Sequence, residues 1–212
     1  MRRVCIICEG PTEANFVSSC LTPHLSGHGV YAYPSILRAP SGRHKGGRVT
    51  IERLVKHISH EYHACDRITT LVDFYGFQDR DGRSRVEVEA AVLAGVAKCT
   101  SGFDPRFVRP YVQMHEFEGL LFANIEAFQW ALDGWNEEVR RKLQAVRDAY
   151  ATPEDINDNT APSKRILAIF AEGTYSKIEH GPVIADAIGL AEIRHQCPAF
   201  NAWVAELEGW GQ

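Results

Sequence analysis

Acidic residues stand in this sequence where apolar runs end. Glu9 closes the run VCIIC, Asp73 closes TTLV, and Glu116 and Glu118 follow RPYVQM. Burying several unpaired carboxylates together is costly, so a positive group must neutralise them. Oxygen ligands without a matching His or Cys cluster suit a hard divalent cation, and we therefore expect Mg²⁺ or Mn²⁺ at a site built from these acids.

Two neighbours of these acids have more than one interpretation. Glu13 follows Glu9 by a helical turn, where it can join the site or simply favour a helix N-terminus through the helix dipole. His115, next to Glu116, can bind a metal, orient a water molecule or pack in the core. Asp73 alone could cap a turn, but its shared position with Glu9 at a strand end favours a role in the site.

Alternating strand and helix patterns explain how these acids can meet. Strand-like runs cover 4–9, 30–37, 67–77 and 106–114, and amphipathic helical patterns cover 11–25, 50–62 and 84–98. This order predicts an α/β fold with a mostly parallel, four-stranded sheet flanked by helices. Ligands of such sheets bind at the carboxyl ends of the strands, where the acids stand.

The second half of the chain has a different pattern. No strand is predicted after residue 116, and helical patterns cover 124–135, 136–150, 162–171, 182–196 and 199–210. We therefore expect an α/β core over residues 1–122 and a helical C-terminal elaboration over residues 123–212 that packs on it.

Composition narrows the possible functions. The 212 residues are 45% hydrophobic with a formal net charge of −4, so any attraction to nucleic acid must come from local patches. No apolar stretch approaches the ~18 residues of a membrane helix, so we expect no membrane span and a cytoplasmic location. The six cysteines are scattered; Cys5 and Cys8 would point to opposite faces of a strand, which argues against a shared metal.

Basic residues cluster in one glycine-rich segment. SGRHKGGRVT carries Arg43, His44, Lys45 and Arg48, and such a loop can bring backbone N–H groups and cations close to phosphate oxygens. A solvated loop is the alternative. The segment lacks the Walker pattern, so nucleotide hydrolysis is not expected. Lys164, with Arg165 beside it, is a further candidate for phosphate contact.

Several motifs together carry a family resemblance. EGPTE after the first strand and LVDFYG after a later one resemble the Toprim fold of topoisomerases, primases and overcoming-lysogenization-defect nucleases. The combination with HKGGRVTIERL, HEFEGLLF and TAPSKRIL is similar to the bacterial domain-of-unknown-function family 4276, whose members are Toprim-like. HEFEGLLF and TAPSKRIL are the most specific of these motifs.

The resemblance implies a Toprim-like (Rossmann-like) core with metal-dependent phosphodiester chemistry. It places Glu9 at the first Toprim glutamate, with Glu13 as its companion, and Asp73 at the first aspartate of the D-x-D motif. Tyr75 stands where the second aspartate is expected. The replacement ligand is then Asp79 or Asp81 in QDRDG, or Glu116 with Glu118; otherwise the site has weakened metal binding or lost activity.

These features together predict a Toprim-like nuclease that cleaves DNA or RNA with Mg²⁺ or Mn²⁺. Some relatives serve as the effector beside an AAA- or ABC-type ATPase in anti-phage defence, which implies such a partner and allows a homo-oligomer. The first alternative is a non-catalytic subunit that docks an ATPase through the aromatic residues of AFQWALDGW and AFNAWVAELEGW. The second is a phosphohydrolase or phosphotransferase acting on small molecules.

Overall fold

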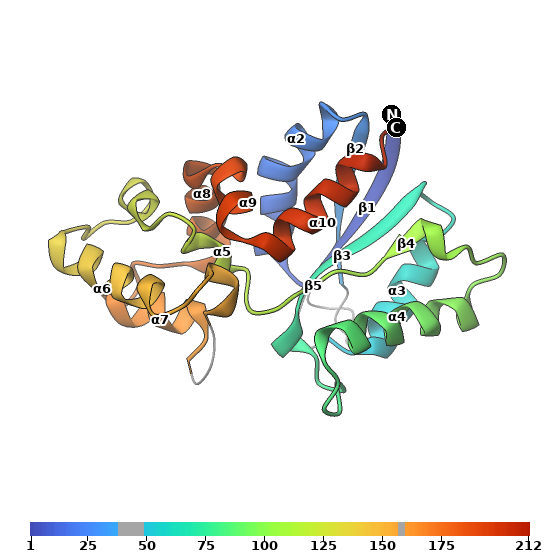
Figure 1. The fold of residues 1–212 in the computed structure, drawn as a ribbon, viewed down its shortest axis with the longest axis horizontal. Coiled ribbons are helices and arrows are strands. Elements are labelled where there is room, and N and C mark those ends of the chain that lie inside the picture. Colours follow the sequence, from blue (N-terminus) through green and yellow to red (C-terminus); the bar gives the residue numbers. More distant parts are fainter. Residues whose placement is uncertain (38–48, 157–159) are drawn as a thin grey trace.

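The computed structural model describes residues 1–37, 49–156 and 160–212. Its centre is a sheet of parallel strands, β1 (Arg2–Cys8), β2 (Val30–Ile36), β3 (Arg67–Asp73), β4 (Val108–Arg109) and β5 (Val112–Gln113). The order is β2-β1-β3-β4, and β5 pairs with β3 beyond β4, so the five strands occupy four positions. This confirms the predicted mostly parallel, helix-flanked sheet (Figure 1).

The predicted strand over 106–114 is divided because Pro110 supplies no backbone donor. Threonine side chains of β3 bridge the interruption. Thr69 Oγ1 donates to the Arg109 carbonyl at 2.7 Å, and Thr70 Oγ1 donates to the Tyr111 carbonyl at 2.6 Å while accepting from the Tyr111 N–H. The other edge strand, β2, also contains a proline, Pro34. Proline is tolerated in sheets mainly at such edge positions.

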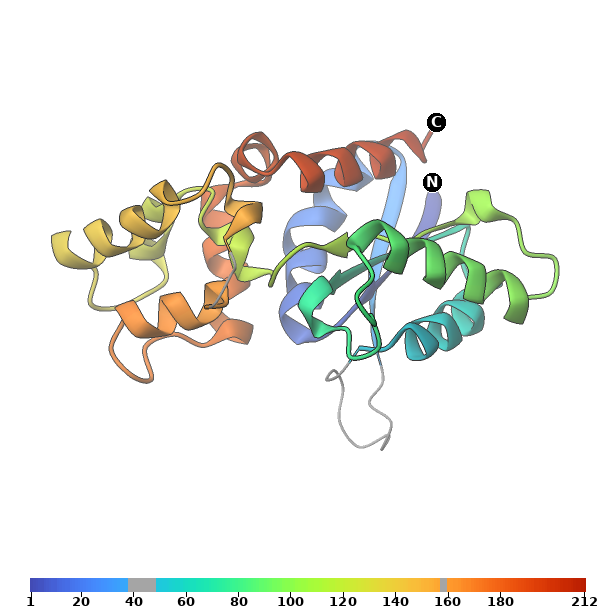
Figure 2. The same ribbon diagram turned by 60° about the horizontal axis from the view of Figure 1, so that its bottom comes forward.

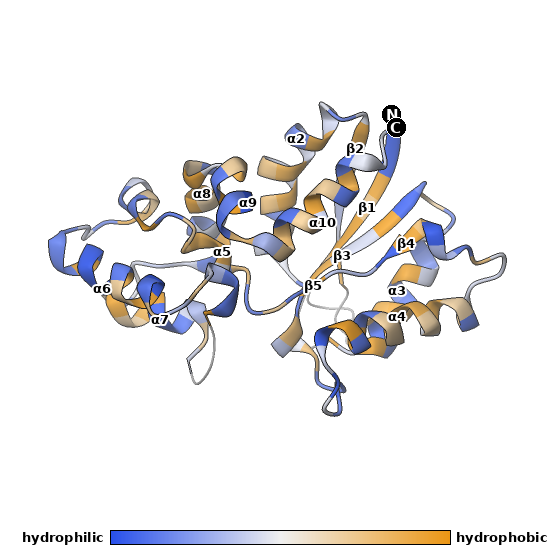
Figure 3. Cartoon of the chain, in the orientation of Figure 1, coloured by the Kyte–Doolittle hydropathy of each residue, from blue (hydrophilic) through white to orange (hydrophobic). Residues whose placement is uncertain are grey.

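Helices cover both faces of the sheet (Figures 1 and 2). One face packs on α3 (Ile51–Glu61) and α4 (Arg85–Cys99), and the other on α1 (Pro11–Phe16), the π-helical turn Val17–Leu21, α2 (Thr22–Ser26) and α10 (Pro198–Gly209). Cys5 faces the first layer and Cys8 the second, as expected from their spacing, and both are free thiols. After its hydrophilic start at the N-terminus, β1 is coloured as apolar (Figure 3).

Two short 3₁₀ helices, Phe74–Gly76 and Pro105–Phe107, precede β5, and the remaining helices follow it. They are α5 (Glu118–Leu121), the 3₁₀ helices Ile125–Trp130 and Pro153–Asp155, α6 (Glu137–Asp148), α7 (Pro162–Ile169), α8 (Lys177–Ile188) and α9 (Leu190–Gln196). The helix predicted over 124–135 is thus wrong in type and length: Gly134, with φ 83°, turns the chain before α6.

The α6 and α7 helices extend away from the sheet, whereas α8 to α10 return to it (Figures 1 and 2). Helices α8 and α1 pack closely at Gly181. A Cβ at this position would lie 3.3 Å from both Thr12 Cγ2 and Phe117 Cε1. The boundary near residue 122 stays a prediction. No helix among the described residues is long and apolar enough to cross a membrane.

Candidate metal centre

The predicted acids meet at the carboxyl edge of the sheet. Glu9 follows β1, Asp73 ends β3, and two glutamates follow β5 at the start of α5. They line one cavity of about 410 Å³, which we call the acidic cavity. Its lining residues are Glu9, Gly10, Pro11, Thr12, Glu13, Asp73, Glu116, Glu118, Ser176, Lys177 and Ile178.

Glu9 and Glu13 are held by backbone groups. The Asp73 N–H approaches Glu9 Oε2 at 3.5 Å, and the Gly10 N–H donates to Glu13 Oε2 at 3.0 Å. Glu13 caps the start of α1 and also lines the cavity, and its role in the site stays a prediction. A Cβ on Gly76 would lie 2.8 Å from Glu9 Oε2, so this glycine leaves the space that the Glu9 carboxylate occupies.

Glu116 and Glu118 share one cation from α8. Lys177 Nζ lies 3.0 Å from Glu116 Oε1 and 3.6 Å from Glu118 Oε1. The other oxygen of Glu116 accepts the Ser163 N–H at 3.0 Å, in the first turn of α7. Glu116 thereby joins the two most specific motifs of the family resemblance, HEFEGLLF and TAPSKRIL, which are far apart in the sequence.

The acids disturb one another's titration. Burial and the nearby charges of Glu13 and Glu9 raise the pKa of Asp73 well above its usual range. Burial is also the main cause that raises the pKa of Glu9 and Glu13, and it raises the pKa of Glu118 to about 7. A carboxylate cluster with raised pKa values is unfavourable to ionise without added positive charge.

Glu116 is the exception within the cavity. Burial alone would raise its pKa, but hydrogen bonds from Ser163 and the charge of Lys177 outweigh burial and lower it. Lys177 is stabilised as a cation in turn: burial acts against its charge, but Glu118 and Glu116 raise its pKa. Among the described residues that line the cavity, one ammonium thus faces five carboxyl groups, and Arg53, outside the lining, also acts to lower the pKa of Glu9; fully ionised, the acids would carry an excess of negative charge.

The residues present fit a divalent cation by their chemistry. All donors are carboxylates, and Lys177 shows that Glu116 and Glu118 can share one positive group. The acids are not drawn tightly together: in the described part of the chain, His24, His28 and Glu208 are the one set of three ligand atoms within 4.8 Å of one another. A cation in the acidic cavity would therefore draw its carboxylates inward.

Of the predicted basic residues, those that the structure describes do not line this cavity. Arg43, His44, Lys45 and Arg48 fall outside the described residues. Lys164 is exposed on α7. Arg165 donates to the Thr160 carbonyl and to the Tyr150 hydroxyl, which is 2.7 Å away.

The D-x-D region is rearranged around aromatic contacts. Tyr75 is half exposed, and its ring stacks on the buried His115 ring with 5.2 Å between the ring centres. The guanidinium carbon of Arg80 lies 4.8 Å from the centre of the Tyr75 ring. His115 thus packs against Tyr75 and does not line the acidic cavity.

The two proposed replacement aspartates are engaged elsewhere. Asp79 accepts the Ile51 N–H at 3.0 Å at the start of α3, and Asp81 pairs with Arg83 on the surface. Of the replacements considered, Glu116 and Glu118 are the two that line the cavity.

Sequence reasoning missed Lys177 and the Ser163 N–H. Lysine in the first turn of a helix opposes the helix dipole, so Lys177 at the start of α8 is locally unfavourable. This unfavourable position was the one feature of the sequence that could have indicated a special role for Lys177. Its acidic partners precede it by about sixty residues, and spacing alone could not identify them.

Comparisons with known proteins agree with the fold. A family model described as Domain of unknown function (DUF4276) matches residues 8–208. The C-terminal region of the Burkholderia pseudomallei OLD protein matches with a TM-score of 0.53 and 15% identity, covering 100% of both chains. The C-terminal region of the Xanthomonas campestris pv. campestris OLD protein, phased with platinum, gives 0.43 and 17%, covering 100% of this chain and 98% of that one. No curated protein matches the chain.

Proposed function

The chain belongs to the DUF4276 family, and from its OLD-like fold and acidic cavity we propose that it is a metal-dependent nuclease of the Toprim type. The observation that carries the proposal is the convergence of carboxylates from three strand ends, with raised pKa values, in one open cavity. Such perturbed groups mark functional sites because they cost stability where they stand.

The roles follow from the positions of the side chains. Glu9, Asp73 and Glu118 would hold Mg²⁺ or Mn²⁺, with Glu116 as a further ligand, and the cation would supply charge neutralisation at a phosphodiester. Glu13 stays fixed by the Gly10 N–H and keeps the first turn of α1 at the cavity wall. Lys177, on exchanging a carboxylate for a phosphate oxygen, would orient the substrate.

Cellular context forms the outer part of the proposal. The proposed site of action is the cytoplasm. An AAA- or ABC-type ATPase is the proposed partner, and anti-phage defence is the proposed setting. The basic residues Arg43, His44, Lys45 and Arg48, with Lys164, remain candidates for phosphate contact.

Calorimetric titration of Mn²⁺ and Mg²⁺ tests the site directly. Wild type should bind, Glu9→Gln should lose binding, and Glu179→Gln should bind as wild type because Glu179 is exposed on α8 outside the cavity. Equal binding by wild type and Glu9→Gln would refute the assignment. The same proteins are then assayed with Mn²⁺ on DNA, RNA and sugar phosphates; turnover of the sugar phosphates alone would identify a small-molecule phosphohydrolase.

One observation favours a docking role as the second candidate. Among the aromatic residues of AFQWALDGW and AFNAWVAELEGW, Phe128, Phe200 and Trp203 are buried, but Trp130 is 75% exposed. If Trp130→Ala abolishes a stoichiometric complex with an ATPase while metal titration detects no binding, the docking function replaces the nuclease.

A further inference from the structure

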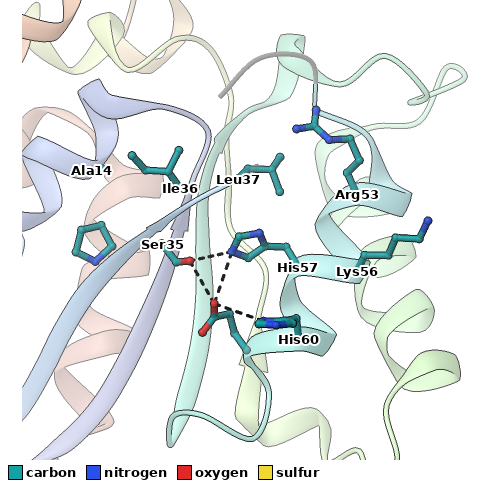
Figure 4. A pocket seen from close by; sticks show the side chains of 10 residues that line it. Ala14, Ser35, Ile36, Leu37, Arg53, Lys56, His57 and His60 are labelled. Atoms are coloured by element: carbon teal, nitrogen blue, oxygen red, sulfur yellow. Dashed lines mark hydrogen bonds and ion pairs between the residues drawn. The ribbon is translucent and has the colours of Figure 1, made fainter. Parts of the chain in front are cut away.

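A second and larger cavity, of about 680 Å³, lies between the end of β2 and α3 (Figure 4). We call it the α3 cleft. Its apolar floor is formed by residues from β2 and α1, and its other wall is formed by α3. The lining residues are Ala14, Pro34, Ser35, Ile36, Leu37, Arg53, Lys56, His57, His60 and Glu61.

Four nitrogen-bearing side chains of α3 line this cleft; in Figure 4 His57 points towards Ser35, whereas Lys56 extends away from it. Arg53, Lys56, His57 and His60 are spaced i, i+3, i+4 and i+7, which puts them on the same side of the helix. From first to last they span roughly 10 Å at the helical rise per residue. A nucleic-acid strand presents one phosphate per ~3.4 Å of duplex length, so this face has the length of about three phosphates.

The inner end of the cleft is polar and largely satisfied. Ser35 Oγ lies 2.8 Å from His57 Nε2 and 3.5 Å from Glu61 Oε1, and His60 Nδ1 lies 3.8 Å from the same carboxylate oxygen (Figure 4). Serine and glutamate both approach the same nitrogen of His57, whereas a nucleophilic triad needs them on opposite ring nitrogens. The group therefore fits binding rather than acyl transfer.

The exposed side chains at the outer end of the cleft can reach a ligand at little cost. Lys56 is 73% exposed, and its partner Glu52, at 2.7 Å, is equally exposed and lies outside the cleft. Exposed pairs of this kind contribute about 0–1 kcal/mol, so Lys56 can exchange Glu52 for a phosphate. His60, 81% exposed in its side chain, stands one helical turn further along the same face.

The α3 cleft and the acidic cavity are neighbours on the carboxyl edge of the sheet. Ala14 lines the cleft and the preceding residue, Glu13, lines the cavity. On the adjacent strands, the Leu37 N–H donates to the Cys8 carbonyl at 2.9 Å, immediately before Glu9. A polymer lying in the cleft is thereby led towards the acids, while a small phosphate compound would occupy one of the two spaces.

We propose that the α3 cleft binds the phosphodiester backbone of a nucleic-acid strand and delivers it to the acidic cavity; this rests on the nuclease function proposed above. The cations are needed because the chain as a whole is acidic and the cavity itself repels phosphate until a metal is bound. Contacts to the backbone predict strong salt dependence and little sequence preference.

The test measures the binding of a short, fluorescein-labelled single-stranded oligonucleotide by fluorescence anisotropy in the presence of Ca²⁺. The wild-type sequence is used, with Ca²⁺ in place of Mg²⁺ or Mn²⁺ so that cleavage does not interfere, because Glu9→Gln is expected to lose the cation that offsets the repulsion of phosphate. Lys56→Gln is made in the wild-type sequence, and Lys142→Gln is the matched control, because Lys142 forms the same exposed i,i+4 pair with Glu138, also at 2.7 Å, on α6. Both lysines are exposed, so neither change removes core packing.

Lys56→Gln should weaken binding about fivefold and reduce the salt dependence by about one phosphate contact, while Lys142→Gln should do neither. Equal affinities for the two variants, or no binding to the oligonucleotide at all, would overturn the inference. Competition by inorganic phosphate as strong as that by unlabelled oligonucleotide would overturn it too, by indicating a small-molecule site. Lys56-dependent binding without Mn²⁺-dependent cleavage by wild type would refute the nuclease and leave the cleft standing.

Discussion

The acidic cavity and the contacts of Glu208 arrange carboxylates and cations in opposite ways. Around Glu208, one carboxylate meets His24 Nε2 at 2.6 Å and Arg194 through both of its oxygens, and His28 lies 3.6 Å away. We call these four residues the Glu208 network. Burial acts against the charge, but Arg194 and His24 outweigh it and lower the pKa of Glu208. In the acidic cavity, by contrast, carboxylates outnumber cations and most of the pKa values rise.

The difference is the one expected between a structural cluster and the proposed metal site. The Glu208 network contains the tighter set of potential metal ligands, yet Arg194 Nη1 stands 3.3 Å from His24 Nε2 and occupies the place of a cation. The network is complete within the chain and joins α2, α9 and α10. The acidic cavity is incomplete, because its excess negative charge calls for a partner from outside the chain.

Removing the cation of the Glu208 network should have the largest effect on stability. Arg194→Met leaves the carboxylate partly buried without its main partner, which should cost about 2 kcal/mol of unfolding free energy. Urea unfolding measures this loss of unfolding free energy. Arg140→Met is the control, since the pair of Arg140 with Glu126 is exposed and its removal should cost less than about 1 kcal/mol. Equal losses for both variants would mean that the network is no more stabilising than a surface pair.

Removing an acid from the cavity should act in the opposite direction. Asp73→Asn relieves repulsion, so in a chelator the variant should be more stable than wild type by about 1 kcal/mol. Added Mn²⁺ should raise the thermal midpoint of wild type but not of the variant. Asp133→Asn, at an exposed position, serves as control. A destabilised Asp73→Asn protein would contradict the idea that these charges are strained.

The pH dependence of Glu208 sharpens the same comparison. Its folded pKa lies below the unfolded value of 4.5, so its stabilisation is present above that pH and is lost as the pH falls through the folded pKa. Glu208→Gln should thus be less stable than wild type by about 1 kcal/mol at neutral pH, and the two should converge in acid. Urea titrations across this pH range measure the difference; a constant gap would contradict the assignment.

The smallest effect on stability is expected at Gly76. In Gly76→Ala the new methyl group meets the end of the flexible Glu9 side chain, which can move aside. Stability should stay within about 0.5 kcal/mol of wild type, whereas Mn²⁺ affinity should fall because the Glu9 carboxylate is displaced. Calorimetry and thermal unfolding on one preparation separate the two quantities, and unchanged Mn²⁺ affinity would exclude Glu9 as a ligand in its present position.

The mostly parallel sheet and the meeting of the acids at its carboxyl edge could be predicted because both depend on local patterns. Apolar runs locate the strands, and parallel strands bring their carboxyl ends together, so Glu9, Asp73 and Glu118 converge without any knowledge of distances. Lys177 could not be assigned to them, since its approach depends on how α8 packs against α1.

The basic face of α3 was within reach of sequence reasoning. Residues 50–62 were predicted as a helix, and the spacing of Arg53, Lys56 and His60 already placed them on one side. What the sequence lacked was the cleft beside that face, which exists because β2 ends next to it. The 3₁₀ helix Ile125–Trp130 was mistaken for an α-helix because composition alone does not distinguish the two.

The two prolines at the margins of the sheet limit how this protein can assemble. Pro34 in β2 and Pro110 between β4 and β5 each remove a backbone donor from an outer strand. A strand from another molecule would find an interrupted ladder on either side, which protects the sheet from edge-to-edge aggregation. Extension of the sheet by a strand of another molecule is thus disfavoured on both sides, which favours assembly through helices and side chains.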